Sequence, residues 1–264
     1  MDGQNVQTQQ AQAMKVTTHE ATILKTILSN LANFRDEGKI IFEKGKGMYA
    51  NVTDPALISV VRVYLSRWVF DQFDVEKEEI SVSFEKLKEI FRQVKKDNKI
   101  SMYKNGSNFI IEVDADVKRK YSLPMLSLEE EYFPNLDEFT FKAKAVVESK
   151  ALKKIISEAR RLLVESLVIY SNGKVLKLTA DETKDFEVEM EIGSMPLMEL
   201  DVKEESKAIY RVDYLEKAVK FADISQHAVL EWSSNNILKL TFYEGLLENP
   251  YFKVEVAVAP QVIE

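Results

Sequence analysis

The most constraining feature of this 264-residue sequence is an internal repeat with a constant offset of 128 positions (152 − 24). The repeat has identical anchors: Leu24, Gly45, Leu87 and Asn108 recur as Leu152, Gly173, Leu215 and Asn236. Residue character is also kept between the anchors, since Ile40-Ile41-Phe42 returns as Val168-Ile169-Tyr170. The period is far longer than the roughly 20–50 residues of a solenoid unit and has the size of a compact domain. We therefore predict two tandem domains of one fold.

Composition supports two folded domains and suggests where they begin and end. With 45% hydrophobic and 30% charged residues, the chain can bury two modest cores beneath a solvated surface. We expect a disordered tail over 1–13, one domain over 14–126, an acidic connecting loop over 127–138 and a second domain over 139–264. The tail is rich in Gln and lacks the apolar core of a signal peptide, so export is not expected. The absence of cysteine excludes disulfides and thiolate chemistry.

The hydrophobic pattern predicts the same order of elements in both halves. For the first and second half respectively, the predicted elements are an opening strand (15–19, 139–147), a helix (20–34, 149–162), a hairpin turn (45–47, 172–173), a second helix (85–96, 212–222) and a closing strand (108–113, 236–242). The apolar run 57–69, too short to span a bilayer, is predicted as one long strand. These elements predict an α+β fold in which each half packs two helices on a mostly antiparallel sheet.

Positive charge is concentrated on the predicted helices, although the whole chain has a formal net charge of −7. The four helices hold thirteen Lys or Arg against six Asp or Glu, a net of +7, so the rest of the chain carries −14. Two helices have basic stripes, formed by Lys150, Lys154 and Arg161 and by Lys88, Arg92 and Lys96. A basic helical layer on an acidic protein would attract phosphates in a salt-sensitive, sequence-independent way. The alternative is a solvated polar face.

In the order and spacing of four short motifs, the sequence resembles the DNA polymerase sliding clamps of the proliferating-cell-nuclear-antigen family, which are ring-shaped proteins of archaea and eukaryotes. The motifs are Ile23-Leu24-Lys25 in the first helix, Asp54-Pro55 before a hydrophobic strand, Ser122-Leu123-Pro124 before the acidic linker, and the terminal Ala259-Pro260. The resemblance covers 14–264. It implies the DNA-clamp fold, with three subunits closing head to tail into a ring whose helices line a hole for DNA.

The resemblance implies a processivity factor for DNA replication and repair that is not an enzyme. Such a subunit would encircle double-stranded DNA without reading its sequence, and would need no catalytic residue, metal or cofactor. Its expected partners are other clamp subunits, in a homotrimer or a heterotrimer with paralogues, and DNA polymerase, flap endonuclease, DNA ligase and the clamp loader through short peptide motifs. The expected location is the cytoplasm in association with the nucleoid, or the nucleus of a eukaryote, with no role for a membrane.

Two sets of candidate residues follow when the basic stripes are combined with the resemblance. The DNA-facing basic set is Lys25, Lys88, Arg92, Lys96, Lys150, Lys154, Arg161, Lys217 and Lys220. The resemblance implies a partner-peptide pocket beside the linker, formed by Ile58, Val60, Phe133, Pro134, Val258, Ala259 and Pro260. An apolar floor suits aromatic anchors of a peptide, and the neighbouring Glu129-Glu130-Glu131 would favour basic flanks. Ordinary packing under a loop is the alternative for the apolar residues.

Two predicted edge segments have opposite charge. Segment 117–123 is basic, whereas 185–192 alternates acidic and apolar residues. In the clamp family these segments pair across subunits, which implies an interface formed by Lys118, Arg119, Lys120, Tyr121, Phe186, Glu187, Val188, Glu189 and Met190. Like charges on a surface strand also prevent aggregation, and this is the competing interpretation.

Other signals point to different chemistry or to a special role within the family. Gly45-Lys46-Gly47 lacks the full phosphate-loop pattern and is predicted as a turn. His19 and His227 have no companion at metal-ligand spacing, so neither metal binding nor general-base catalysis is expected. The acidic group Asp181, Glu182 and Asp185 suggests, as an alternative from another class, a magnesium-dependent two-domain hydrolase, with a solvated loop as the simpler interpretation. Glu89 and Ser157 stand where many clamps carry a basic residue, so a specialised paralogue that works only in a heterotrimeric ring is a further alternative.

Overall fold

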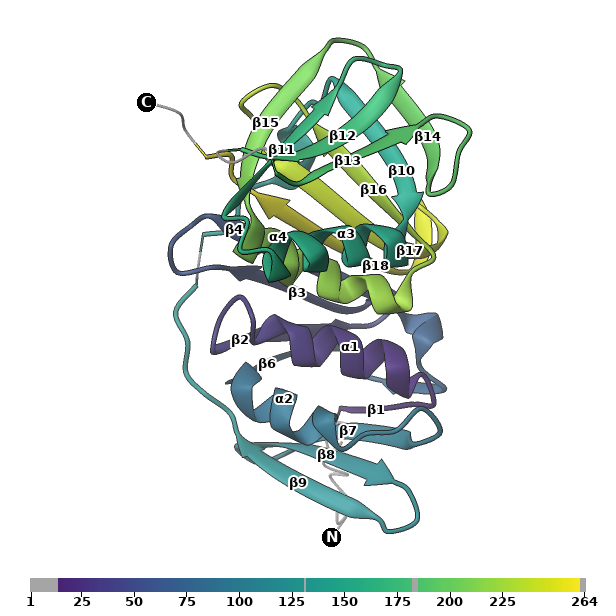
Figure 1. Cartoon of the computed structure of the whole chain (residues 1–264). Helices are drawn as coiled ribbons and strands as arrows, with labels where there is room; N and C mark the ends of the chain where they lie inside the picture. Colours follow the sequence, from purple (N-terminus) through teal and green to yellow (C-terminus); the bar gives the residue numbers. More distant parts are fainter. Residues whose placement is uncertain (1–13, 131, 182–184, 262–264) are drawn as a thin grey trace, which may run out of the picture.

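The structure is a computed structural model that describes residues 14–130, 132–181 and 185–261. Within these residues each half supplies two α-helices, which lie as one layer across a face of the strands (Figure 1). The helices are α1 (Ala21–Leu31), α2 (Phe84–Arg92), α3 (Ser149–Arg161) and α4 (Val212–Ala218), the last continuing as the 3-10 turn η3 (Val219–Ile224). Their apolar residues recur every three or four positions, so that one side of each helix is buried against the strands.

The strands of the described residues form three sheets in which every pairing is antiparallel. The first has five strands in the order β5 (Gln72–Asp74), β1 (Lys15–Thr18), β7 (Lys99–Asn105), β8 (Asn108–Asp114) and β9 (Arg119–Pro124). The second has four strands in the order β13 (Glu187–Glu191), β12 (Val175–Ala180), β11 (Ser166–Ser171) and β15 (Ser206–Arg211). The third has nine strands in the order β14 (Leu197–Val202), β10 (Ala143–Glu148), β16 (His227–Trp232), β17 (Leu238–Leu246), β18 (Asn249–Val258), β4 (Ser59–Ser66), β3 (Gly47–Thr53), β2 (Glu37–Glu43) and β6 (Lys77–Ser83). The predicted α+β class is therefore confirmed.

The nine-stranded sheet runs through both halves of the chain because β4 of the first half pairs with β18 of the second. This pairing satisfies the main-chain groups along two strands that would otherwise be exposed edges. The inward residues of the two strands, such as Val61, Val63 and Val256, are fully buried. The main cluster of buried apolar residues draws on both halves of the chain, so the cores of the two halves are continuous with each other.

Both second helices end earlier than predicted. Helix α2 ends at Arg92, and beyond it the Asn98 side chain accepts the Lys95 N–H (2.8 Å), which holds the chain in a turn. Lys96 therefore does not extend the helical stripe of Lys88 and Arg92. Helix α4 ends at Ala218, and the remaining predicted residues form η3.

The apolar run 57–69 is not one strand. Leu57 adopts a positive φ of 58° and donates its N–H to the Asp54 carbonyl (2.9 Å), which makes a turn before β4. After Ser66 the chain forms the 3-10 turn η1 (Arg67–Val69), in which the Ser66 hydroxyl accepts the Trp68 N–H (3.3 Å). The hydrophobic pattern located the strand, whereas local hydrogen bonds set its ends.

Candidate DNA interface, partner site and subunit edges

Helix α3 presents an exposed basic face. Leu152 and Ile156 are buried against the strands, whereas Lys150, Lys154 and Arg161 are exposed. Lys150 and Lys154 make no ion pair within the described residues, and Arg161 donates from Nε to a carbonyl in its own helix (3.3 Å). These three side chains are therefore available to an anion outside the helical layer.

Lys25 and Lys220, by contrast, donate to groups of the protein. Lys25 Nζ reaches the carbonyls of Arg92 (3.3 Å) and Val94 (2.8 Å). Carbonyls at a helix C-terminus lack intrahelical partners, and a lysine is a favourable donor to them. Lys220 Nζ donates to Asn33 Oδ1 (3.5 Å), which links η3 to the end of α1. Both lysines thus connect elements of the helical layer.

The remaining basic candidates on α2 and α4 make only weak contacts, each with a residue of its own helix. Arg92 pairs with Glu89 (3.0 Å), and Lys88 lies 4.0 Å from Glu85. Lys217 Nζ stands 4.7 Å from the centre of the Tyr214 ring. Exposed pairs of this kind contribute little and exchange readily with other ions. The nine basic candidates therefore differ. The three on α3 have free charge, those on α2 and α4 are weakly engaged, Lys25 and Lys220 donate to groups of the protein, and Lys96 is exposed beyond the end of α2.

The connecting loop is attached to the first half at several points. At its start the Leu126 N–H donates to the Ser81 carbonyl of β6 (2.8 Å). Further along, the Thr53 hydroxyl donates to the Tyr132 carbonyl (3.1 Å). The loop ends in the 3-10 turn η2 (Leu136–Glu138). These attachments hold the loop beside the strand ends, along one side of the molecule (Figure 1).

Arg62 fastens the end of the loop to the junction between the two halves. It donates to both carboxylate oxygens of Asp137 (2.8 and 2.9 Å) and from Nε to Glu255 (2.6 Å). Glu255 is only 4% exposed, and Lys253 Nζ lies 3.5 Å from it. The hydrogen bond from Arg62 holds the pKa of Asp137 below its usual range. Hydrogen bonds to Asp137 and Glu255 raise the pKa of Arg62, so Arg62 and Asp137 both stay charged near neutral pH.

The predicted partner-pocket residues come together where β4 begins and β18 ends. The Ala259 N–H donates to the Ile58 carbonyl (2.8 Å), and Val60 lies opposite Ala257 in the strand register. Ile58, Ala259 and Pro260 are half-buried. Val258 is fully buried in the main core, so its side chain can support such a pocket but cannot touch a partner.

The apolar floor of this region is a small cluster under the connecting loop. Val60, Leu136 and Ala257 are buried in it, and Phe133 packs against it. Pro134 is half-buried beside Phe133. We did not predict Leu136, although an apolar residue inside a charged linker is the same signal that singled out Phe133.

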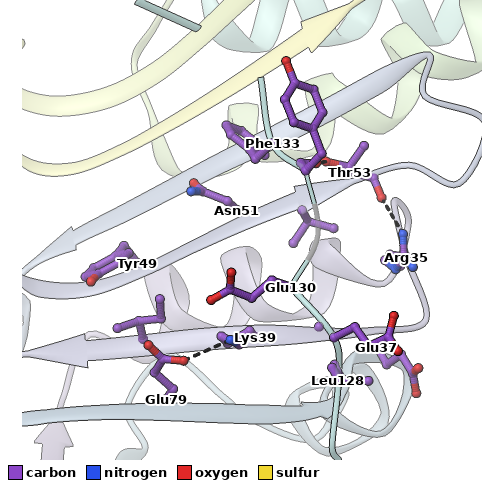
Figure 2. Close-up of a pocket in the computed structure, with 15 residues that line it drawn as sticks. Arg35, Glu37, Lys39, Tyr49, Asn51, Thr53, Glu79, Leu128, Glu130 and Phe133 are labelled. Atoms are coloured by element: carbon purple, nitrogen blue, oxygen red, sulfur yellow. Dashed lines mark hydrogen bonds and ion pairs between the residues drawn. The ribbon is translucent and has the colours of Figure 1, made fainter. Parts of the chain in front are cut away.

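A cavity of about 240 Å³ lies between the loop and strands β2 and β3, with Phe133 at its rim (Figure 2). Arg35, Lys39, Glu79 and Glu130 line it, and Lys39 pairs with Glu79 (2.9 Å). We did not predict this cavity, because its walls come from segments about 90 positions apart that only the fold brings together.

The two predicted interface segments form edge strands, β9 in the five-stranded sheet and β13 in the four-stranded sheet. On β8, Glu112 lies 3.2 Å from Lys118 and 3.9 Å from Lys120. On β12, Lys177 lies 2.8 Å from Glu187 and 3.8 Å from Glu189. At each edge, a single opposite charge on the neighbouring strand contacts two charges of the edge segment. It neutralises only one of them, so the β9 edge keeps excess positive charge and the β13 edge keeps excess negative charge.

The apolar residues of the two edges differ in exposure. Phe186 and Met190 are buried in the core of the chain itself, while Val188 is half-buried. Tyr121 is half-buried and, with Ile90 of α2, lines a groove of about 550 Å³ beside β9. Among the predicted interface residues, the open apolar surface therefore lies on the β9 side.

The remaining sequence signals do not assemble into a site in the described part of the chain. There, no group of three His, Cys, Asp or Glu side chains is placed to hold a metal ion, and Glu182 lies outside the described residues. Gly45 lies in the hairpin turn between β2 and β3, and Gly47 is the first residue of β3. His19 contacts Asp71 (2.7 Å), and His227 opens β16. None of the helices in the described residues is long and apolar enough to cross a membrane.

Comparison with known proteins gives consistent matches along most of the chain. The DNA polymerase sliding clamp of Nanoarchaeum equitans is 28% identical over 235 residues, which cover 87% of this chain and 93% of that protein. The sliding clamp of Thermococcus gammatolerans is 26% identical over 90% of this chain and 94% of its own length. No protein-family model matches the sequence.

Solved structures show the same fold. In the PCNA2-PCNA3 complex from Sulfolobus tokodaii, one chain superposes with a TM-score of 0.86 at 20% identity, over 94% of this chain and 99% of the other. The proliferating cellular nuclear antigen of Entamoeba histolytica gives a TM-score of 0.83 at 17% identity, over 95% of this chain and all of the other. The expected clamp fold is thereby confirmed.

Proposed function

We propose that this chain, a relative of the archaeal DNA polymerase sliding clamps, is a subunit of a processivity clamp that encircles duplex DNA. The observation that carries the proposal is the single helical layer with an exposed basic face on a chain whose net charge is −7. A closed ring is retained on DNA by its topology, so diffuse contacts with phosphates are sufficient and allow sliding. The chain acts without catalysis, as a mobile platform for replication and repair enzymes.

The ring is proposed to close by pairing β9 of one subunit with β13 of the next. Head-to-tail contacts of this kind use two different surfaces, and a closing rotation generates a ring. The excess positive charge of β9 and the excess negative charge of β13 support this pairing. The likeness to a subunit of a complex of two different clamp proteins favours paralogues as neighbours, with identical copies as the alternative.

The partner site is proposed at Ile58, Val60, Phe133, Pro134, Ala259 and Pro260, supported from below by Val258. Its occupants would be short apolar peptide motifs of DNA polymerase, flap endonuclease, DNA ligase and the clamp loader. The half-buried Phe133 and Pro260 offer apolar contact, and the acidic loop attracts basic flanks. The hydrolase alternative finds no support in the relatives, nor in a metal-binding group among the described residues.

The test of this function is retention on circular DNA. The purified chain is loaded by the clamp loader of its organism, either alone or mixed with related clamp subunits. We expect it to stay on nicked circular DNA and to dissociate once the same DNA is linearised. Reversing Glu187, Glu189 and Glu191 to Lys should remove most closed rings, at least about tenfold, because like charges would then face each other across the edge. Sedimentation and native mass measure the assembly.

The matched control reverses acidic residues on a different edge strand, Glu199→Lys with Asp201→Lys on β14. This control should assemble and be retained normally. If the unmodified protein dissociated equally from linear and circular DNA, the clamp function would be contradicted. Normal assembly of the β13 variant would contradict only the electrostatic account of the interface.

Phosphate contacts are expected to be concentrated on α3. Replacing Lys150, Lys154 and Arg161 with Gln should lower the salt dependence of DNA binding, by up to about 3 in the slope of log K against log salt, because each phosphate contact contributes about 0.9. Replacing Lys25 with Gln should leave that slope nearly unchanged and cost about 1 kcal/mol of unfolding free energy, because Lys25 donates to carbonyls of the protein.

The control for the α3 variant carries Gln at Lys142, Lys144 and Lys203, which line a pocket beside β10. It removes the same charge from a surface outside the helical layer. DNA binding is measured by fluorescence anisotropy over a series of salt concentrations, and stability by urea unfolding. Equal slopes for the α3 variant and this control would contradict the assignment of phosphate contacts to α3.

A further inference from the structure

Three large apolar side chains are exposed where β17 turns into β18 and where η1 follows β4. Trp68 is 70% exposed, Leu246 75% and Leu247 42%. Single exposed apolar residues are common on soluble proteins and need no explanation. A group of such residues, including a tryptophan, is typical of a protein interaction site.

The strand register places these residues at the same end of the sheet junction. Strands β4 and β18 are antiparallel, and Leu65 near the end of β4 pairs with Phe252 near the start of β18. The first residues of β18 therefore lie beside η1, which follows β4. At that start, Leu246 pairs with Asn249 in the adjoining hairpin. The other end of the same two strands carries the Ile58–Ala259 contact, roughly 20 Å away at the rise of an extended strand. In Figure 1 the connecting loop and the C-terminus lie on one side of the molecule and the β17–β18 turn on the other.

The turn that carries Trp68 is held in place by hydrogen bonds. The Thr18 hydroxyl donates to the Val69 carbonyl (2.6 Å), which ties η1 to β1. The Ser66 hydroxyl accepts the Trp68 N–H, and the Arg67 guanidinium stacks 4.6 Å from the centre of the Trp68 ring. A fixed aromatic side chain loses little conformational entropy on binding, which favours its use as an anchor.

The rim of this surface is acidic. Burial, together with the negative charges of Glu20, Glu244 and Asp71, raises the pKa of Tyr251 to about 12, which places these carboxylates around the start of β18. Glu248 lies in the exposed turn between β17 and β18. Such a rim repels phosphates and anionic lipid and attracts Lys or Arg.

We propose that Trp68, Leu246 and Leu247 form a second docking surface, the Trp68 patch, for a basic segment of a partner protein that inserts aliphatic or aromatic anchors between acidic neighbours. The patch lies on the side of the molecule away from the connecting loop, so both surfaces can be occupied on one subunit. The chain's own residues 1–13 do not fit, because they contain Asp2 and neither Lys nor Arg.

A defined peptide tests the proposal with Trp68 as the reporter. The protein has two tryptophans, and Trp232 is fully buried, so a change in the exposed emission reports on Trp68. The probe is a short synthetic amphipathic peptide with leucine anchors and lysine flanks. We expect it to shift the emission to shorter wavelength, and Leu246→Ser with Leu247→Ser to weaken its binding at least about tenfold. Glu244→Gln with Glu248→Gln should weaken it and reduce its salt dependence.

The matched control is Leu163→Ser, which removes an 83% exposed leucine from another surface and should leave the affinity unchanged. Unaltered Trp232 emission and circular dichroism establish that each variant is folded. The proposal is overturned by full-strength binding to the Leu246→Ser/Leu247→Ser variant or by equal binding of a peptide with Glu in place of Lys. It is also overturned if anionic vesicles, and not the peptide, cause the emission shift. Sedimentation that shows the patch joining copies of this chain would overturn it as well.

Discussion

Replacing Gly47 with alanine should destabilise the protein by at least about 3 kcal/mol, or prevent folding. Gly47 opens β3 with a φ of +123°, a conformation that L side chains rarely adopt. A Cβ at this position would lie 2.1 Å from the Leu65 carbonyl oxygen and 2.8 Å from the Arg67 nitrogen. Both are backbone atoms of the adjoining segment, so the clash could be relieved only by opening the β3–β4 pairing beside the junction of the two halves. Urea unfolding measures the loss.

Gly45 provides the matched control within the same turn. It also has a positive φ, of +77°, but a Cβ there would meet nothing within 4 Å. Gly45→Ala should therefore cost only the backbone strain, about 1–2 kcal/mol. Equal losses for the two alanine variants would show that the close approach of β4 to Gly47 is not a determinant of stability.

Replacing Arg62 with methionine should cost about 3 kcal/mol, because it leaves the buried Glu255 carboxylate without its closest cation. Lys253 at 3.5 Å compensates only in part, since it is farther from the carboxylate than Arg62 at 2.6 Å. The double variant Arg62→Met with Glu255→Met should recover most of the loss, because it removes the unpaired charge together with its partner. Thermal and urea unfolding check both variants, and a double variant as unstable as the single one would contradict this assignment.

The same variant should alter stability at acidic pH through Asp137. Its pKa in the folded protein is lowered from the usual 3.8, so its contribution is present in full above that value and is lost as the pH falls through the folded pKa. Arg62→Met removes the largest cause of this lowering and should flatten this acid limb of the stability curve. Asp137 itself is 68% exposed, so Asp137→Asn should change stability little at neutral pH while releasing the end of the connecting loop. Weaker peptide binding by Asp137→Asn at unchanged stability would show that Arg62 positions the partner site.

The elements that could be predicted are those whose signal is local. Helices α1 and α3 lie within a few residues of the predicted ranges, because their apolar residues at three- and four-residue spacing depend only on neighbours in the chain. The repeat also predicted equivalent elements in the two halves. The errors at Lys96 and in the run 57–69 have one cause. Each depends on a hydrogen bond or a strand partner that the hydrophobic pattern does not encode.

The sequence by itself determined that the chain is a duplicated α+β protein with basic helices on an acidic background, since composition and periodicity are properties of the chain. Only the tertiary structure decided which charges are free. Lys25 and Lys154 are both lysines on predicted amphipathic helices. In the structure, however, Lys25 donates to the Val94 carbonyl 69 positions away, whereas Lys154 remains exposed. The pairing of β4 with β18, the Arg62–Glu255 contact and the close approach of Leu65 to Gly47 are likewise decided in three dimensions. Hydrogen bonds and steric contacts act over a few ångströms, and the fold alone determines which distant residues come that close.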